Sequence, residues 1–305
     1  MVYRLLVLDL DGTVMGDDLQ IRPAVRQAVQ RAQEGGVAVT LATGRAFTSA
    51  RGFAKELGIS APLVCYQGGL IKSPVDGRVL HSETYPAWLA HELLGWVSER
   101  EAQPFHEPLG SKASWGRWAD SPFPMGTIEV AMFIDDTMYL QSADGDPDFW
   151  TRYFGQRVRQ VDCLASALHQ DPTKSMLIAH PATCDEIAPE LKEAFEGQLQ
   201  VVRSHPLFVE AVPVGVTKGR GVARLAAHLG VTRAATIAVG DNENDLTMVE
   251  WAGLGVAMGN GTPEVKAIAD WVAPAVSEDG VAAVIDRFIL QPAVVVATGC
   301  RADED

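Results

Sequence analysis

Short apolar runs that end in polar residues recur along the chain, and they predict strands buried on both faces of a sheet. Segments with helical spacing separate the early runs, and glycines or prolines mark the turns between them. Strands and helices that alternate with short turns predict parallel strands and right-handed crossovers. The first predicted strands cover residues 5–8, 37–42 and 63–66, with helices over 23–34 and 47–57 and a β-hairpin over 70–81.

The pattern changes near residue 83, where turn formers interrupt the chain often. Short strands joined by tight turns then outnumber helices, which predicts an antiparallel sheet. The strand–helix alternation returns near residue 212. In the middle segment the predicted strands cover residues 127–133, 138–142, 175–179, 199–203 and 207–212, with a helix over 184–195; in the last segment they cover 236–239 and 255–258, with helices over 218–229 and 245–252.

The chain of 305 residues is long enough for two domains that each bury a core. We expect an α/β core domain formed by residues 1–82 and 212–292, interrupted by an inserted α+β domain of residues 83–211. Residues 293–305 end in acidic side chains and are expected to form a loose tail. Neither the oligomeric state nor a protein partner can be inferred from the sequence.

The net charge of −14 disfavours partners that are themselves polyanionic, so nucleic acid and anionic membranes are poor candidates. The four cysteines have neither the spacing of a metal site nor that of a disulfide framework, and we expect reduced thiols. The first ten residues lack the features of a signal peptide, and no apolar stretch is long enough to span a bilayer. We therefore expect a soluble cytoplasmic protein.

Two groups of carboxylates follow predicted strands, and they carry the strongest chemical signal. Asp9-Leu10-Asp11-Gly12-Thr13 follows the first strand, and Gly240-Asp241-Asn242-Glu243-Asn244-Asp245 follows the strand over 236–239. Ligands of an open parallel sheet bind beyond the carboxyl ends of its strands. Carboxylates gathered there repel one another unless a cation neutralises them, and such oxygen ligands suit Mg²⁺.

The pair Asp9 and Asp11 can divide the work of phosphoryl transfer. Two residues apart at a strand end, their side chains are expected on the same side. One carboxylate can attack phosphorus while the other exchanges protons with the leaving oxygen and with water. An isolated Asp-x-Asp more often makes only a turn, but the second acidic group favours the catalytic interpretation here.

Thr43, Gly44 and Arg45 follow the predicted strand over 37–42 and precede a helix. A Thr hydroxyl with exposed backbone N–H groups can cradle a phosphate, although a Thr before a helix can equally be a plain N-cap. Arg45 is expected either to contact the phosphate ester or only to cover the surface. Lys218 begins a helix, where the dipole disfavours a cation, so it is a candidate to balance phosphoryl oxygens and carboxylates, although it can equally be a solvated lysine.

In the second acidic group, we expect Asp241 to be a metal ligand because it lies nearest the strand end. Asn244 can donate to phosphate, and Asp245 can hold Lys218 or metal-bound water. The seven histidines show no metal-ligand pairing and are interpreted as ordinary. The polar, aromatic segment of residues 105–121, with Trp115 and Trp118, is the candidate substrate-facing stretch of the insert.

These four motifs, in this order, resemble those of the haloacid dehalogenase-like phosphatases, specifically their Cof-type branch. The resemblance covers nearly the whole chain and implies a Rossmann-like parallel-sheet core with an inserted α/β cap domain. It also implies an opening and closing of the cap over the site. Gln67-Gly68-Gly69 stands where Asn-Gly-Ala is usual, a departure close to the expected seam between core and cap.

The resemblance implies a role for each motif residue. Asp9 is the nucleophile and Asp11 the general acid and base, while Mg²⁺ is held by Asp9, the backbone carbonyl of Asp11, and Asp241. Thr43 and Lys218 correspond to the family's phosphate-binding positions. The expected activity is hydrolysis of a small phosphorylated metabolite such as a sugar phosphate, through an aspartyl-phosphate. A phosphomutase or phosphotransferase on the same scaffold, and a binding regulator without activity, remain as alternatives.

Overall fold

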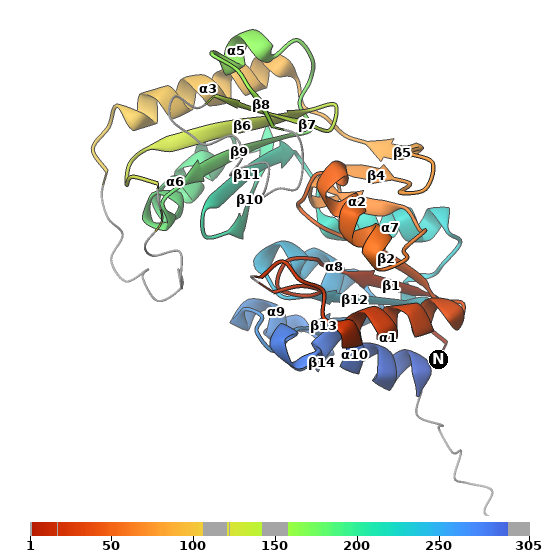
Figure 1. Cartoon of the computed structure of the whole chain (residues 1–305). Helices are drawn as coiled ribbons and strands as arrows, with labels where there is room; N and C mark the ends of the chain where they lie inside the picture. Colours follow the sequence, from red (N-terminus) through yellow and green to blue (C-terminus); the bar gives the residue numbers. More distant parts are fainter. Residues whose placement is uncertain (1, 17, 106–120, 122, 142–157, 292–305) are drawn as a thin grey trace, which may run out of the picture.

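The computed structural model of the chain describes residues 2–16, 18–105, 121, 123–141 and 158–291 (Figure 1). Two layered bodies lie one above the other in this view, and the chain passes from the lower to the upper body and back. Most of the segment predicted to face the substrate, including Trp115 and Trp118, lies outside the described residues. The expected tail over 293–305 lies outside them as well.

The lower body is built on a five-stranded parallel sheet with β1 next to its edge strand β2. Strands β1 and β12 are apolar along their whole length because both faces of the sheet are covered. Leu6 and Leu8 pack on one side and Leu5 and Val7 on the other. The strands, in sheet order, are β14 (Trp271–Val272), β13 (Leu254–Ala257), β12 (Thr236–Gly240), β1 (Leu5–Leu8) and β2 (Ala38–Leu41).

Helices cover both faces of this sheet, as expected for strands joined by right-handed crossovers. One face carries α1 (Pro23–Glu34), α2 (Phe47–Glu56) and α10 (Gly280–Ile285), which continues into a π-helical turn over Asp286–Leu290. The other face carries α7 (Lys218–His228), α8 (Leu246–Trp251) and α9 (Pro263–Ile268). The predicted strands and helices of this body are confirmed, while α9 and α10 were not predicted.

The third predicted strand does not simply extend the parallel sheet. A parallel bridge between Ala42 and Val64 joins it to the end of β2. Beyond that bridge, β3 (Leu63–Cys65) pairs antiparallel with β4 (Leu70–Lys72), which pairs with β5 (Val79–Ser82). The predicted hairpin is confirmed, and it turns the end of the core toward the upper body (Figure 1).

The upper body is a six-stranded sheet that is antiparallel except between β7 and β8. Its residues alternate between two surfaces: Val130 and Met132 pack against helices, whereas Ala131 and Phe133 face the core domain. In sheet order the strands are β10 (Leu199–His205), β11 (Phe208–Pro213), β9 (Lys174–Ala179), β6 (Ile128–Ile134), β7 (Thr137–Gln141) and β8 (Val158–Gln160); the helices are α3 (Ala87–Glu101), α5 (Leu164–Ala167) and α6 (Pro181–Ala194).

The architecture is therefore an α/β parallel-sheet core with a separate, sheet-rich second domain, as the sequence predicts. Helix α3 was missed, although Leu89, Leu93 and Val97 recur at helical spacing along it and are buried. The predicted helix over 184–195 begins earlier, at Pro181, where proline suits the first turn. We propose the same division into domains, with the second boundary after Pro213 because β11 pairs within the upper sheet up to that residue.

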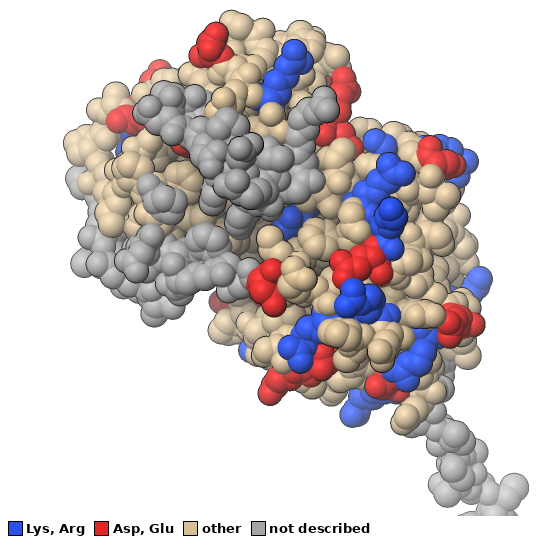
Figure 2. Space-filling model, viewed as in Figure 1, with Lys and Arg blue, Asp and Glu red and all other residues tan. Residues whose placement is uncertain are grey.

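Side chains of both signs lie close together over the face of the core domain shown in Figure 2. Several of them form exposed ion pairs, such as Arg22 with Asp279 and Arg26 with Glu56. Pairs of this kind each contribute little stability. None of the helices within the described residues combines the length and the apolar composition needed to cross a membrane.

Two glycines with left-handed backbone provide a matched test of the close packing between the turn after β3 and the start of α7. A Cβ atom on Gly68 would lie 2.3 Å from the backbone oxygen of Thr217, whereas one on Gly77 would meet nothing within 4 Å. Gly77→Ala therefore adds only backbone strain, about 1–2 kcal/mol, and is expected to lower the thermal midpoint by roughly 2–4 °C. Gly68→Ala is expected to lower it at least about twice as far. Equal shifts would show that the close approach of Gly68 to Thr217 is not required.

Candidate active site

Asp9 and Lys218 form the buried centre of the site. Asp9 directly follows β1, and its side chain is almost inaccessible to solvent. Lys218 is the first residue of α7, whose N-cap is Thr217, and its side chain is 1% exposed. Its ammonium group donates to one oxygen of Asp9 and one of Asp245, both at 2.6 Å. The cation that the sequence places at an unfavourable helix start is thus held by two buried carboxylates.

The turn after β12 brings Asp241 and Asp245 to the same place. One oxygen of Asp245 accepts from Lys218, and the other accepts from the backbone N–H groups of Asp241 and Asn242 at 2.9 and 3.0 Å. Thr13 donates its hydroxyl to Asp241 at 2.9 Å. A Cβ atom at position 12 would lie 2.3 Å from the Asp241 carboxylate, so only glycine lets the turn after Asp11 approach so closely.

The carboxylates of the cluster lie so close together that their negative charges repel one another. Burial raises the pKa of Asp9 to about 7, with a further rise from Asp245 that Lys218 partly opposes. Burial, with the charges of Asp9 and Asp245, raises the pKa of Asp241 well above its ordinary value. Burial alone would lower the pKa of Lys218, but the two carboxylates bound to it raise it above its ordinary value. The cluster carries one ammonium for three acids and needs further positive charge.

The residues present fit a divalent cation. Oxygen atoms of Asp9, Asp241 and Asp245 lie within 4.8 Å of one another. Asp245 already accepts hydrogen bonds on both oxygens, so Asp9 and Asp241 are the carboxylates left to bind a metal. An oxygen-only donor set suits a hard cation. The structure therefore has an acidic cluster able to bind a metal ion, and the carboxylate of Asp11 is not part of it.

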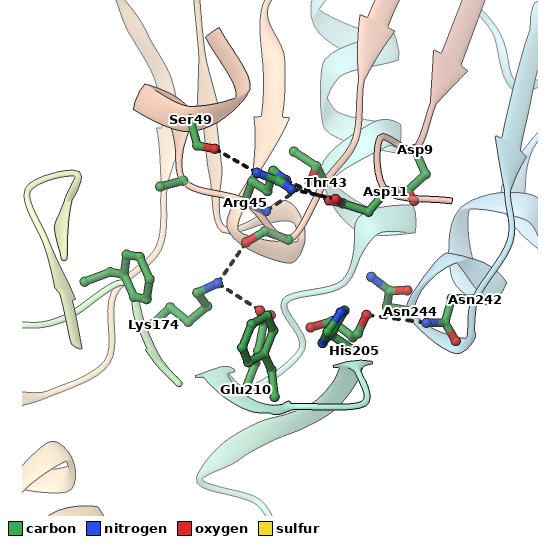
Figure 3. Close-up of a pocket in the computed structure, with 15 residues that line it drawn as sticks. Asp9, Asp11, Thr43, Arg45, Ser49, Lys174, His205, Glu210, Asn242 and Asn244 are labelled. Atoms are coloured by element: carbon green, nitrogen blue, oxygen red, sulfur yellow. Dashed lines mark hydrogen bonds and ion pairs between the residues drawn. The ribbon is translucent and has the colours of Figure 1, made fainter. Parts of the chain in front are cut away.

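Asp11 points instead toward Arg45 (Figure 3). The guanidinium donates through two nitrogens to the two carboxylate oxygens at 2.7 and 2.8 Å. Loss of solvent around the carboxyl group would raise the pKa of Asp11, but the charge and hydrogen bonds of Arg45 outweigh this effect and keep that pKa below its ordinary range. The side chain of Arg45 is 9% exposed while that of Asp11 is 47% exposed. Of the two alternatives for Arg45, a residue that only covers the surface does not fit this burial, and contact with the phosphate ester stays a prediction.

Thr43 and Gly44 lie in the turn between β2 and α2. Thr43 is buried, and its hydroxyl accepts from the backbone N–H of Arg45 at 3.1 Å. The helix begins only at Phe47, with Ala46 as its N-cap, so the interpretation of Thr43 as a plain N-cap was wrong. Backbone hydrogen bonds from Thr43 N–H to Val64 and from Gln67 N–H to the Thr43 oxygen hold the turn in place at the rim of the pocket.

A pocket joins these groups to the second domain (Figure 3). It holds about 650 Å³ of empty space, including the part open to solvent. Asp9, Asp11, Thr43, Gly44 and Asn244 line it from the core. Lys218, Asp241 and Asp245 lie behind Asp9, which places all the candidate residues of the core at the same end of the sheet.

Several residues of the second domain also line the pocket, and sequence reasoning missed them. His205 and Phe208 stack with ring centroids 4.7 Å apart, and Lys174 and Glu210 pair at 2.9 Å. The interpretation of all seven histidines as ordinary therefore misses the place of His205. No motif surrounds these residues, but Glu210 stands in an otherwise apolar buried strand, which was a usable signal.

The raised pKa of Asp9 predicts how pH affects the metal-free protein. The Asp9 carboxyl loses its proton near pH 3.8 in the unfolded chain and near pH 7 in the folded protein. The contribution of Asp9 to the free energy of unfolding therefore falls as pH rises between these two values. In the presence of a chelator, the thermal midpoint of the wild type is expected to fall by several degrees relative to Asp9→Asn over this range. Adding Mg²⁺ at neutral pH is expected to offset the loss in the wild type. Parallel midpoint curves for the two proteins would contradict the crowding argument.

Known proteins share this fold and sequence along most of the chain. A profile of the haloacid dehalogenase-like hydrolase family matches residues 6–109 and 121–285. The 5-amino-6-(5-phospho-D-ribitylamino)uracil phosphatase YcsE of Bacillus subtilis is 27% identical, over 94% of this chain and 96% of its own. The HMP-PP phosphatase of Cronobacter sakazakii is 28% identical, over 87% of each chain.

A crystal structure agrees with these sequence relationships. A haloacid dehalogenase-like hydrolase from Bacteroides thetaiotaomicron is 26% identical and superimposes with a TM-score of 0.76. The match covers 93% of this chain and 99% of that one. The chain belongs to the haloacid dehalogenase-like hydrolase family, in its Cof-type phosphatase branch.

Proposed function

We propose that the protein is a Mg²⁺-dependent phosphatase that hydrolyses a small phosphomonoester through an aspartyl-phosphate on Asp9. The observation that carries the proposal is the cluster at the floor of the pocket, where a buried carboxylate pairs with Lys218 next to two further acids. Asp11 stands beside it, more exposed to solvent. Two carboxylates in such different surroundings suit two different roles.

In the first step, a carboxylate oxygen of Asp9 attacks phosphorus and the bond to the leaving oxygen breaks. Asp11 gives its proton to that oxygen, so the alcohol departs neutral. Because Arg45 favours the ionised form of Asp11, the substrate must weaken this ion pair before the proton can be held and donated. Thr43, Gly44 and Asn244 are proposed to bind the phosphoryl oxygens, and Arg45 to contact the substrate.

In the second step, Asp11 takes a proton from water, and the resulting hydroxide attacks phosphorus. The bond between phosphorus and Asp9 breaks, which releases orthophosphate and restores the carboxylate. Lys218, held by Asp245, keeps its positive charge next to the Asp9 side chain in both steps. Asp9, Asp241 and the backbone carbonyl of Asp11 are proposed to hold Mg²⁺, which neutralises charge on the phosphoryl group when it is bound.

The substrate is proposed to be a small phosphorylated metabolite. The pocket is lined by a few charged and polar side chains together with the rings of Phe133 and Phe208, a lining that suits a small polar molecule. Two relatives are named as phosphatases of phosphorylated small molecules, a phosphoribitylaminouracil and HMP-PP. Neither nucleic acid nor a membrane is proposed as a partner, and the cytoplasmic location predicted from the sequence stays a prediction.

Replacing Asp9 tests the mechanism. Asp9→Asn cannot form the acyl phosphate, so Mg²⁺-dependent release of phosphate from an aryl phosphate is expected to fall at least about 10³-fold. In ¹⁸O-water the wild-type protein is expected to place the label in free orthophosphate. With a sugar phosphate in place of the aryl phosphate, an isomerised product without labelled phosphate would favour the mutase alternative. Full activity in a folded Asp9→Asn protein would contradict the proposal.

Replacing Asp11 separates the two steps. Asp11→Asn is expected to slow hydrolysis of alkyl phosphates by about 10²–10⁴-fold because the leaving alkoxide receives no proton. An aryl phosphate with an acidic phenol needs no such help in the first step, but the second step still lacks its base. Stopped-flow measurements should therefore show a burst of about one equivalent of phenolate, followed by slow turnover. Equal losses for both substrates without a burst would remove Asp11 from this role.

A further inference from the structure

A continuous chain of buried polar contacts crosses from the second domain into the core. The Lys174 ammonium donates to the backbone oxygen of Gly44 and to Glu210, each at 2.9 Å. The other oxygen of Glu210 accepts from the Gln67 amide at 2.8 Å. The amide oxygen of Gln67 accepts from Asn244 at 3.1 Å. Figure 3 shows the first part of this chain, where Lys174 lies between Glu210 and the turn that carries Arg45.

The ion pair at the centre of the chain is almost completely removed from water. Lys174 is 2% exposed and Glu210 3% exposed, and the ammonium lies 4.6 Å from the centre of the Phe133 ring. A buried pair of this kind gains little net stability over apolar residues of similar size, because both charges lose their hydration. Stability alone is therefore a poor explanation for the pair.

Gln67 is the core residue that accepts this chain of contacts from the second domain, and its backbone conformation is unusual. Its φ is +60°, that of Tyr66 is +51°, and neither residue is a glycine. Such conformations are costly for side chains of this size and concentrate at functional sites. A Cβ atom on Gly44 would lie 2.4 Å from the Gln67 amide nitrogen, so the two turns touch.

The two residues at the ends of this chain of contacts, Gly44 and Asn244, lie at the proposed phosphate site. Gly44 is in the turn after β2 and Asn244 in the turn after β12, and both line the pocket with Asp9 and Asp11. Within the core these two turns belong to strands on opposite sides of β1. Gln67 and the pair of the second domain connect them without touching the acidic cluster.

We propose that Lys174, Glu210 and Gln67 are positioning residues that set the distance between the two phosphate-binding turns, so that the phosphate site is complete only when the second domain is docked. The inference rests on the proposed function, since it assigns the phosphate to Gly44 and Asn244. Gln67 is one methylene longer than the Asn usual at its position, and here its amide reaches both Glu210 and Asn244.

The test replaces the ion pair without leaving an unpaired buried charge. Lys174→Met combined with Glu210→Gln keeps the side-chain volumes close and removes both charges, so the thermal midpoint is expected to stay near that of the wild type. Orthophosphate is expected to inhibit this double variant at least about tenfold more weakly, and kcat/KM for an aryl phosphate to fall about 10–100-fold. Amide exchange in residues 43–46 and 242–246 is expected to speed up.

A matched control removes a buried ion pair that does not reach the core. Glu186 pairs with Arg100 at 2.7 Å within the second domain, and both side chains are largely buried; Arg100 also pairs with Glu190 at 2.6 Å, so Glu186→Gln leaves it one acidic partner. Glu186→Gln is expected to lower the thermal midpoint while inhibition by orthophosphate stays as in the wild type. Gln67→Asn offers a second probe, because Asn tolerates positive φ better than Gln while its side chain is too short for both contacts.

The outcomes distinguish this inference from the proposed function. If the wild-type protein neither hydrolyses the aryl phosphate nor binds orthophosphate in the presence of Mg²⁺, the proposed function fails, and this inference fails with it. If the wild type does both, and the double variant and Gln67→Asn match it in inhibition and in exchange at the two turns, only the inference is overturned. Weaker inhibition in both variants, but not in Glu186→Gln, supports it.

Discussion

A single buried ammonium group allows acidic residues to gather at the carboxyl ends of two neighbouring parallel strands. Lys218 pairs with Asp9 after β1 and with Asp245 after β12, and Asp241 lies within the same cluster. Without this cation, the buried carboxylates of Asp9 and Asp245, with the half-buried one of Asp241 within 4.8 Å, would strongly oppose folding in their ionised form. With it, the cluster still holds three acids for one ammonium, and this repulsion adds to burial in raising the pKa of Asp9. The site is thus prepared for a metal ion by the fold.

The parallel sheet explains why residues so distant in the sequence meet. Strands β1 and β12 are adjacent and parallel, so the turns that follow them lie side by side. Gly12 lets one turn approach Asp241 of the other, and Thr13 fixes the contact. The second domain then closes the pocket from outside, with contacts such as that between Lys174 and Gly44. The proposed catalytic residues belong to the core, and most of the remaining lining comes from the other domain.

Much of the core and its site could be predicted because the signals are local. Apolar runs that end in carboxylates mark the strands and their ends, and Lys218 is conspicuous because it violates a local preference. The Arg45–Asp11 pair could not be predicted, since it depends on the path of the turn after β2. Lys174, His205 and Glu210 were missed because they reach the site through the packing of two domains, which no short motif records. Gln67 was noticed only as a departure from a family pattern, and its partners became visible with the structure.

The proposed mechanism requires Asp9 to become phosphorylated during turnover. To detect this intermediate, the wild-type protein is quenched with acid during steady-state hydrolysis of an aryl phosphate, and its peptides are mapped by mass spectrometry. We expect one phosphoryl group, on the peptide that contains Asp9 and on that side chain. A phosphoryl group on another residue, or none under conditions where the second step limits the rate, would contradict it.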